Sequence, residues 1–340
     1  MSNFSEESLT TGQLVLGPPL IQVSQLSKKH QRLLNRLKKQ GKVRQLAPGV
    51  YMRVQMWEEL GSDPQGKKRQ AAAMAAATAG SSRITQPRPL AGRTAAAAIG
   101  MPLVGWEPTD SAEVIAAHTC RSKFIRPRAL TKSGGLTVVH TEFGRLTATD
   151  PLTTAVDLAL HHGLDHCVVA AEWCVREGLF TKQDFVDRVD ELRGVPGVRV
   201  ARTACRLING LSESPRESQW KVQMFLAGLP APYQQVKIYN SAGEFVGRAD
   251  FFWENGIVGE YDGREKYSHG DPVRFAAAVE QERARERALM AAGCVVVRAD
   301  KASFASGADI EHLKQLHAQL SQTGYRFPSK QRSGGGLAWE

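Results

Sequence analysis

Acidic side chains cluster in a predicted β-hairpin near residue 250. Asp250 precedes the turn Glu254-Asn255-Gly256, and Glu260 and Asp262 follow it. Residues two apart on a strand share a face. Carboxylates crowded on one face oppose each other's ionisation unless a cation lies between them. Because Mg²⁺ and Mn²⁺ prefer such hard oxygen ligands, the sequence predicts a site for one of these ions.

The register of this hairpin decides whether its carboxylates meet. A two-residue Asn255-Gly256 loop pairs Asp250 with Tyr261 and leaves Glu260 and Asp262 on the opposite face. A three-residue loop, with Gly256 in the left-handed conformation, pairs Asp250 directly with Glu260. The sequence alone leaves both registers open.

A fourth carboxylate, Glu217, lies in the first turn of a predicted helix that runs from Ser214 to about Ala227. Ser214-Pro215-Arg216-Glu217 matches a capping box, in which the glutamate only caps the helix. Glu217, Trp220 and Met224 also share the helical stripe that packs on a sheet. Both interpretations place this carboxylate at the helix start.

A second helix is predicted from about Phe275 to Ala292, followed by a buried strand over Val295–Arg298. Glu282 and Arg285 interrupt the apolar stripe of this helix. They either point towards the acidic hairpin or form an ion pair with each other at i, i+3 spacing.

Together these elements resemble the PD-(D/E)XK nuclease superfamily, and more closely the group related to very-short-patch-repair endonucleases. The resemblance covers about residues 212–305 and implies a restriction-endonuclease-like α/β/α core that hydrolyses DNA phosphodiesters. It implies that Asp250, Glu260 and Glu217 hold Mg²⁺ or Mn²⁺. Asp262 stands where the superfamily has a lysine, so Lys266 becomes the candidate for that role. The motifs that carry the resemblance are Pro215-x-Glu217, Gly228-Leu229-Pro230, Gly247-Arg248-x-Asp250-Phe251, Glu260-Tyr261-Asp262-Gly263-x-x-Lys266-Tyr267 and Arg285-Glu286.

Positive charge is concentrated near the N-terminus. The chain has a net charge of +10, and the segment from Ser24 to Trp57 holds nine basic residues and no acidic ones. Such a segment is typical of a protein that binds nucleic acid, although a solvated basic helix has the same composition. We assign DNA contacts to Lys28, Lys29, Arg32, Arg36, Lys39, Lys42 and Arg44.

The pattern within this segment predicts a winged helix-turn-helix. Ser27 caps a helix from Lys28 to about Gln40, and two strands flank a Pro48-Gly49 turn. The run GKVRQLAPGVY, from Gly41 to Tyr51, resembles the winged-helix domain of the AbiEi family, the antitoxins of type IV toxin–antitoxin systems. That resemblance implies a transcriptional repressor with a cognate toxin as a possible partner.

The middle of the chain carries no recognisable chemistry. Its run Thr149–Ala159 resembles the region that follows the winged helix in AbiEi-type proteins. The nearby acid and histidines match no metal or acid–base template, so we interpret them as caps and surface residues. They are Asp157, His118, His140, His161, His162 and His166.

Length and composition indicate a multidomain α/β protein. The 340 residues are 42% hydrophobic and 23% charged, which is ordinary for a folded protein. We expect a winged-helix domain over 10–60, a mixed α/β region over 68–205, a nuclease-like domain over 212–322 and a disordered tail over 329–340. Five scattered cysteines, no secretory signal and no long apolar run predict a cytoplasmic protein without a membrane partner. The sequence does not indicate an oligomeric state.

Two functions follow from these patterns. The first is a DNA-binding, Mg²⁺-dependent endonuclease. The second is an antitoxin-type repressor that binds operator DNA and whose nuclease-like fold is catalytically silent. The crowded carboxylates favour the first, and the aspartate at the lysine position favours the second.

Overall fold

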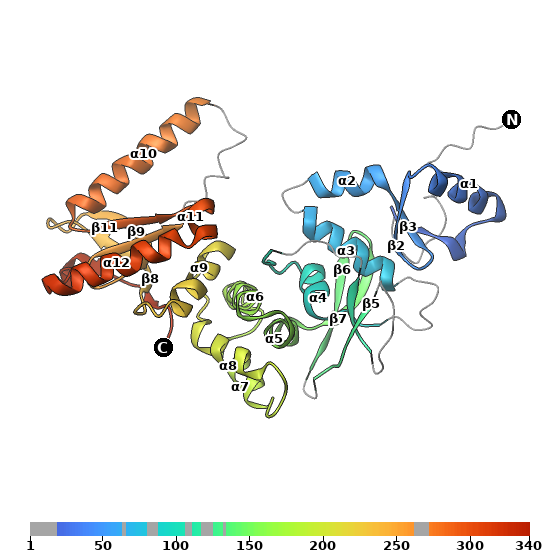
Figure 1. The fold of residues 1–340 in the computed structure, drawn as a ribbon, viewed down its shortest axis with the longest axis horizontal. Helices are drawn as coiled ribbons and strands as arrows, with labels where there is room; N and C mark the ends of the chain where they lie inside the picture. Colours follow the sequence, from blue (N-terminus) through green and yellow to red (C-terminus); the bar gives the residue numbers. More distant parts are fainter. Residues whose placement is uncertain are drawn as a thin grey trace. The chain divides into compact units, whose positions relative to one another are not determined.

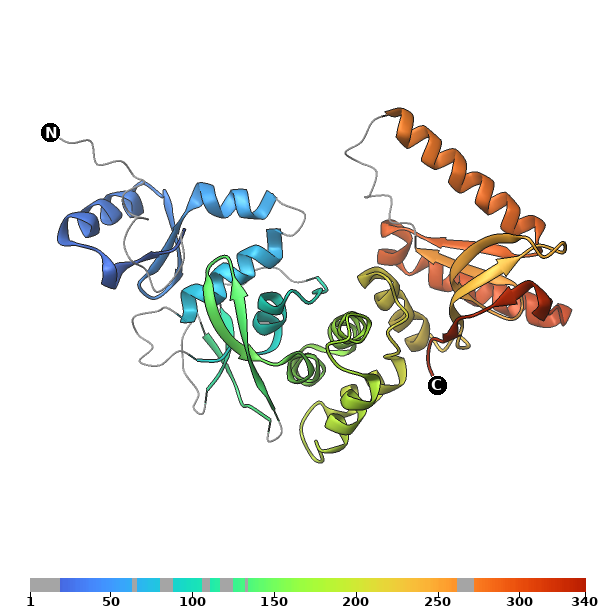
Figure 2. The same cartoon turned by 180° about the vertical axis from the view of Figure 1, so that it is seen from behind.

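The computed structural model describes residues 19–62, 66–79, 88–105, 111–116, 125–131, 134–261 and 272–340 (Figures 1 and 2). The chain is a mixed α/β protein that divides into two compact units. Unit 1 comprises Met1–Ala170 and Leu179–Arg202, and unit 2 comprises Ala171–Gly178 and Thr203–Glu340. In sequence, two of the three unit boundaries fall within helices α6 (Leu164–Arg176) and α8 (Val198–Leu207), and the third lies between Gly178 and Leu179.

The described part of unit 1 begins with one helix and a small antiparallel sheet. Helix α1 (Lys28–Lys39) starts after Ser27, whose hydroxyl accepts a hydrogen bond from the His30 N–H (3.3 Å). Leu34 and Leu37 of this helix pack against the sheet. The predicted order of helix, strand, turn and strand is therefore present. The sheet has the order β1-β3-β2, with β1 at Ile21–Gln22, β2 at Val43–Ala47 and β3 at Val50–Arg53.

Strand pairs and short helices form the rest of unit 1. Parallel strands β4 and β5 form one pair, and antiparallel strands β6 and β7 form another. Leu90 bridges to both Val114 and Ala148, so the two pairs lie next to each other. The strands are β4 (Ala112–Ile115), β5 (Ile125–Arg128), β6 (Leu136–Thr141) and β7 (Gly144–Thr149). The helices are α2 (Val54–Ser62), α3 (Gly66–Ala79), α4 (Gly92–Ile99), α5 (Pro151–His162) and α7 (Lys182–Asp190).

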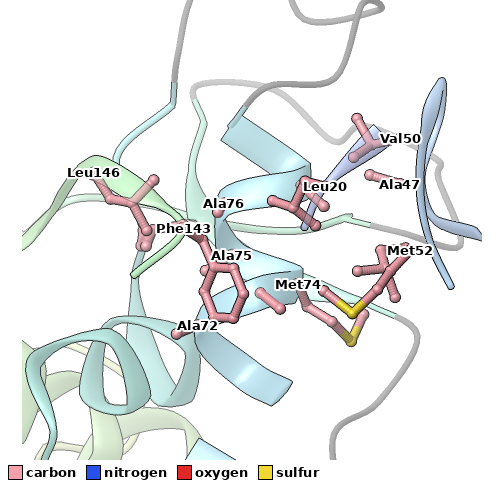
Figure 3. Close-up of a cluster of buried hydrophobic side chains, with 14 of the residues drawn as sticks. Leu20, Ala47, Val50, Met52, Ala72, Met74, Ala75, Ala76, Phe143 and Leu146 are labelled. Atoms are coloured by element: carbon pink, nitrogen blue, oxygen red, sulfur yellow. The ribbon is translucent and has the colours of Figure 1, made fainter. Parts of the chain in front are cut away.

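One hydrophobic core joins these parts of unit 1. Its centre is α3, where every residue from Ala71 to Ala77 is buried. Figure 3 shows Phe143 and Leu146 on one side of this helix and Met52 on the other. Alanine side chains let strands approach an α-helix closely on several sides. The core thus runs across the domain boundary that we placed between residues 60 and 68.

Unit 2 is built on a mixed sheet of the order β11-β10-β9-β8, with β12 and β13 both paired to β8. Strands β10 and β11 are parallel, and the other pairs are antiparallel. The strands are β8 (Tyr233–Tyr239), β9 (Phe245–Phe252), β10 (Ile257–Tyr261), β11 (Val295–Ala299), β12 (Arg332–Ser333) and β13 (Gly336–Leu337). The helices are α9 (Pro215–Leu226), α10 (Pro272–Ala291), α11 (Lys301–Ser306) and α12 (Ala308–Thr323).

Helices cover both faces of this sheet. Trp220 of α9 packs edge-on against Phe251 of β9, with ring centroids 5.5 Å apart. The next residue of β9, Phe252, belongs to a hydrophobic core that also contains Leu289 of α10. Since successive strand residues point to opposite faces, α9 and α10 lie on opposite sides of the sheet. This arrangement is consistent with the predicted helix–sheet–helix layering.

A buried ion pair holds the segment that leads into α9. Lys221 Nζ lies 3.0 Å from Glu172 Oε1, and both side chains are essentially inaccessible to water. Glu172 also accepts the backbone N–H groups of Asn209 and Ser212. A buried charge needs such partners, so this cluster fixes the chain between α8 and α9.

The expectation of a disordered tail over 329–340 is wrong. Strands β12 and β13 extend the sheet, and Trp339 is buried with its ring 5.7 Å from that of Phe225. Gly334 and Gly335 adopt positive φ angles between the two strands. The register along β8 is the same on both sides of the glycines, with Arg332 opposite Ile238 and Leu337 opposite Tyr233, so the glycine run is an irregularity within one edge strand rather than a flexible end.

The sequence allowed two registers for the β9–β10 hairpin. The structure has the register with a three-residue loop. The Trp253 N–H donates to the Ile257 carbonyl (2.9 Å), and Phe251 faces Gly259 across the pair. Gly256 in the loop has φ +82°. One residue further along each strand, Asp250 therefore lies opposite Glu260.

No helix among the described residues combines the length and the apolar character needed to cross a membrane.

We expect Gly256→Ala to lower the free energy of unfolding by about 1–3 kcal/mol, because the substitution places a side chain in the left-handed region. The added Cβ would also lie 3.1 Å from the Gly293 carbonyl oxygen and from a Tyr325 ring carbon. Denaturant unfolding measures the loss. Gly243→Ala is the control, because Gly243 has φ +83° but an added Cβ there would meet nothing within 4 Å. Equal losses in the two variants would contradict a contribution from the close contacts.

Candidate functional site

Two of the predicted acidic residues are brought together in unit 2. Asp250 and Glu260 are cross-strand neighbours on β9 and β10, and a third, Glu217, lies in the first turn of α9. The Tyr261 N–H donates to Asp250 Oδ2 (3.3 Å). Glu217 and Glu260 are 7% and 5% exposed, so this acidic group is largely withdrawn from water.

Burial and mutual repulsion disfavour the charged forms of these carboxyls. Burial, followed by the charge of Asp250, raises the pKa of Glu217 to about 7. Burial also raises the pKa values of Asp250 and Glu260 above their ordinary range. Repulsion of this kind is relieved when a cation binds.

Glu217 also has a structural partner. Its Oε2 accepts the Glu213 N–H (2.9 Å), and the Ser214 hydroxyl accepts the Glu217 N–H (3.1 Å). The predicted cap is thus present, with the return bond made one residue earlier than a capping box requires. Trp220 and Met224 are buried as predicted, but burial covers most of α9 rather than one stripe, since Ser218, Gln219, Lys221 and Val222 are buried too.

Gln235 of β8 is a residue of this site that sequence reasoning missed. It is the one described residue other than glycine with a positive φ angle (+56°). Its Nε2 donates to Glu217 Oε2 (3.3 Å), while its buried Oε1 makes no hydrogen bond. Strained backbone of this kind gathers at functional sites. The sequence carries no signal for it, because the conformation depends on the sheet around it.

Two arginines neutralise Glu260. Arg285 of α10 donates to both carboxylate oxygens, and Arg298 Nη2 of β11 lies 3.4 Å from Glu260 Oε2. Arg285 also bonds Glu282 Oε1 (3.1 Å), and Arg298 pairs with that same oxygen. Both interpretations of Glu282 and Arg285 therefore hold: the pair exists, and its arginine reaches the acidic group.

The remaining predicted catalytic residues, Asp262 and Lys266, lie outside the described residues. Among the residues that the structure describes, no set of three or more acidic, histidine or cysteine side chains is arranged closely enough to hold a metal ion. Glu217, Asp250 and Glu260 still supply oxygen donors of the kind that Mg²⁺ or Mn²⁺ prefers; Glu217 and Glu260 are buried, and Asp250 is half-buried.

The predicted DNA-contacting residues of unit 1 lie on one helix and the adjoining strand. The face of α1 opposite Leu34 and Leu37 is solvent-exposed and basic. Arg44 of β2 stacks on the Trp57 ring, with its guanidinium carbon 4.7 Å from the ring centroid. Six of the seven assigned residues are exposed: Lys28, Lys29, Arg32, Arg36, Lys39 and Lys42.

Our interpretation of the middle-region acid and histidines as caps and surface residues is wrong for two of them. His162 and Asp157 are buried together with Glu113 of β4. Glu113 Oε2 accepts the Arg93 N–H and lies 2.9 Å from His162 Nε2, and its Oε1 pairs with Arg128 (2.9 Å). These residues come from four elements, so no local spacing predicts their meeting.

The other histidines of that set are not part of this ion-pair cluster. His140 is exposed, and His118 lies outside the described residues. His161 is exposed like His140, and His166 is half-buried, where burial lowers its pKa to about 4.

Asp157 is the unusual member of this cluster. It is 1% exposed, and neither of its carboxylate oxygens makes a hydrogen bond of good geometry. Burial raises its pKa to about 7, whereas hydrogen bonding and the charges of His162 and Arg128 hold the pKa of Glu113 at about 2. The sequence did offer a signal: Asp157 interrupts the apolar run from Ala155 to Ala159.

Comparisons with known proteins give partial similarity and no family. No family model matches the chain, and no solved structure matches it. Two proteins from Mycobacterium tuberculosis, "Uncharacterized protein MT2308" of strain CDC 1551 / Oshkosh and "Uncharacterized protein Rv2248" of strain ATCC 25618 / H37Rv, are each 32% identical to it over 123 residues. The match covers 36% of this chain and 45% of each relative.

Asp157 should make stability depend on pH. Its folded-state pKa of about 7 exceeds the ordinary 3.8, so its stabilising contribution is complete below about pH 4 and is lost as the pH rises to 7. We expect Asp157→Asn to remove a slope of up to about 1.4 kcal/mol per pH unit in that window. Unfolding measured between these pH values tests this. The exposed Asp190→Asn is the control, and an unchanged slope in Asp157→Asn would contradict the assignment.

Proposed function

We propose that this protein binds DNA through α1 and the β2–β3 hairpin and hydrolyses DNA phosphodiesters at the Glu217–Asp250–Glu260 site with Mg²⁺ or Mn²⁺. The observation that carries the proposal is the register that sets Asp250 opposite Glu260, beside Glu217. Buried carboxylates with raised pKa values are costly to the fold, and such cost is typical of functional sites.

The topology of unit 2 supports the nuclease part of this proposal. A helix, three antiparallel strands, a second helix and a fourth strand parallel to the third follow in that order. This is the order that the PD-(D/E)XK resemblance leads us to expect. Function must still be argued from the site, because unrelated functions share folds.

The residues of the site have separate roles in the proposed reaction. Glu217, Asp250 and Glu260 would hold the cation, and Asp262 would ligate it or orient the attacking water. A bound divalent cation supplies Lewis-acid polarisation of the phosphate and a more acidic bound water. Lys266 or Arg285 would neutralise negative charge on the phosphoryl group.

DNA binding is supported by the charge on α1. Its outward face carries five of the seven assigned basic residues, and Lys42, directly before β2, and Arg44, within it, continue the positive charge. A helix in the major groove with basic side chains on the phosphates is the docking geometry of helix-turn-helix proteins.

One observation favours the alternative of a catalytically silent regulator. Arg285 and Arg298 already neutralise Glu260, so this carboxylate is satisfied without a metal ion. A repressor needs only the DNA-binding face and a stable second unit. The cleavage and binding experiments below separate the two functions.

We expect purified protein to cleave supercoiled, linear or single-stranded DNA with Mg²⁺ or Mn²⁺ and not with EDTA. Asp250→Asn should reduce the cleavage rate by at least about a hundredfold, the scale of losing one preorganised charged group. Glu311→Gln, a substitution at an exposed carboxylate of α12, is the control. Full cleavage by Asp250→Asn would contradict the site. Absence of cleavage with intact DNA binding would support the regulator.

DNA binding should weaken steeply with salt, because phosphate contacts release counterions. We expect Arg32→Gln to make the slope of log K against log salt shallower by about 0.9, the value for one phosphate contact. Fluorescence anisotropy with duplex DNA between about 50 and 200 mM salt measures this slope. Lys314→Gln removes the same charge from α12 of unit 2 and should leave the slope unchanged. Binding that is independent of salt would contradict the DNA-binding face.

A further inference from the structure

One line of side chains runs along α1 on the side away from its sheet. Leu34 and Leu37 of this helix are buried. Positions three or four apart in the sequence lie above one another on an α-helix, so four exposed residues share the opposite side. They are Lys28, Arg32, Asn35 and Lys39. When a helix that packs through its leucines docks in a major groove, this line faces the base pairs.

Asn35 differs from the other members of this line in charge and in length. The other three carry long, flexible cationic side chains, which reach from the helix to the phosphates on either side of the groove. The asparagine side chain is short, so its amide stays directly beneath the docked helix. In the major groove, the groups at that place are base edges rather than phosphates.

The amide of Asn35 is available for such a contact. The side chain is exposed, and none of the residues that the structure describes forms a hydrogen bond with its amide. The neighbouring exposed amide is already engaged, because Gln31 Nε2 donates to the Leu26 carbonyl oxygen (3.0 Å). Lys38, beside the line, holds its ammonium over the Tyr51 ring, 4.1 Å from the centroid. Asn35 therefore offers both a donor and an acceptor at the centre of the basic face.

We propose that Asn35 reads an adenine in the bound DNA and so gives α1 a sequence preference. The Nδ2 group donates to adenine N7, and Oδ1 accepts from the N6 amino group. Adenine is the base that presents an acceptor and a donor side by side in the major groove. This inference rests on the proposed function, because it assumes that α1 docks in that groove. It adds to that function the base that the target contains.

The test selects bound duplexes from a random-sequence library with the full-length protein, in EDTA so that metal-dependent cleavage does not interfere. We expect one position at which adenine exceeds each other base by at least about fivefold, the scale of one two-point contact with a base. Asn35→Ala should abolish that preference and leave the salt slope of binding unchanged, because no charge is lost. The variant should fold, since alanine favours a helix more than asparagine does.

Asn35→Arg gives a readout that a purely structural role would not change. Arginine pairs with O6 and N7 of guanine, so we expect the preference at the same position to change from adenine to guanine. Gln40→Ala is the matched control, because Gln40 is an exposed amide at the C-cap of α1 and lies off the line. This control should keep the adenine preference.

The outcomes separate this inference from the function on which it rests. If the unsubstituted protein selects no adenine, or if Asn35→Ala selects the same bases, the inference is overturned. Uniformly weaker binding of all sequences by Asn35→Ala would also overturn it, because that result indicates a phosphate contact. In these three cases salt-dependent binding leaves the DNA-binding proposal standing. If the unsubstituted protein binds no duplex in a salt-dependent way, the DNA-binding proposal fails together with the inference.

Discussion

The register between β9 and β10 is the constraint on which the acidic site depends. Side chains alternate between the faces of a strand, so a shift of one residue would move Glu260 away from Asp250. The three-residue loop that prevents this shift requires a residue with φ near +82°, and Gly256 supplies it. Arg285 reaches Glu260 over Gly247, a second position where a side chain would intrude. Gly256 thus fixes the strand register that pairs Asp250 with Glu260, and Gly247 leaves room for the Arg285 side chain that contacts Glu260.

Buried charge is handled in the same way in both units. Glu113 in unit 1 pairs with Arg128 and His162, and Glu172 in unit 2 pairs with Lys221. In each case the partners lie far apart in the sequence, because the cost of burial is offset only where separate elements meet. Glu217 differs from these residues: its described partners are uncharged donors, and a carboxylate lies nearby. The burial of Glu217 is therefore offset by neutral hydrogen-bond donors, whereas that of Glu113 and Glu172 is offset by positive charges.

The basic helix α1 is part of a larger folded unit. Its sheet shares a hydrophobic core with α3 and with strands β6 and β7, and Met52 and Phe143 belong to the same cluster. The β1-β3-β2 sheet is thus held by the middle region through one face, whereas Leu34 and Leu37 of α1 pack with Ile21 and Tyr51 in a small separate core. By composition alone, the alanine-rich sequence of α3 indicates only a good helix former. In the fold, its small side chains also let strands pack on the helix from more than one side.

Local patterns determined most of the elements, and tertiary contacts determined the site. Ser27 and Ser214 marked the two helix starts, because capping depends on residues close in sequence. The hairpin strands were also predictable, but two registers remained until the fold selected one. The burial of Asp157 and the ordered C-terminal strands could not be predicted, because each depends on surfaces supplied by distant segments. The sequence therefore determined which residues carry charge and where helices and strands begin, whereas only the tertiary structure decided which charges meet, since burial and pairing are properties of packed elements.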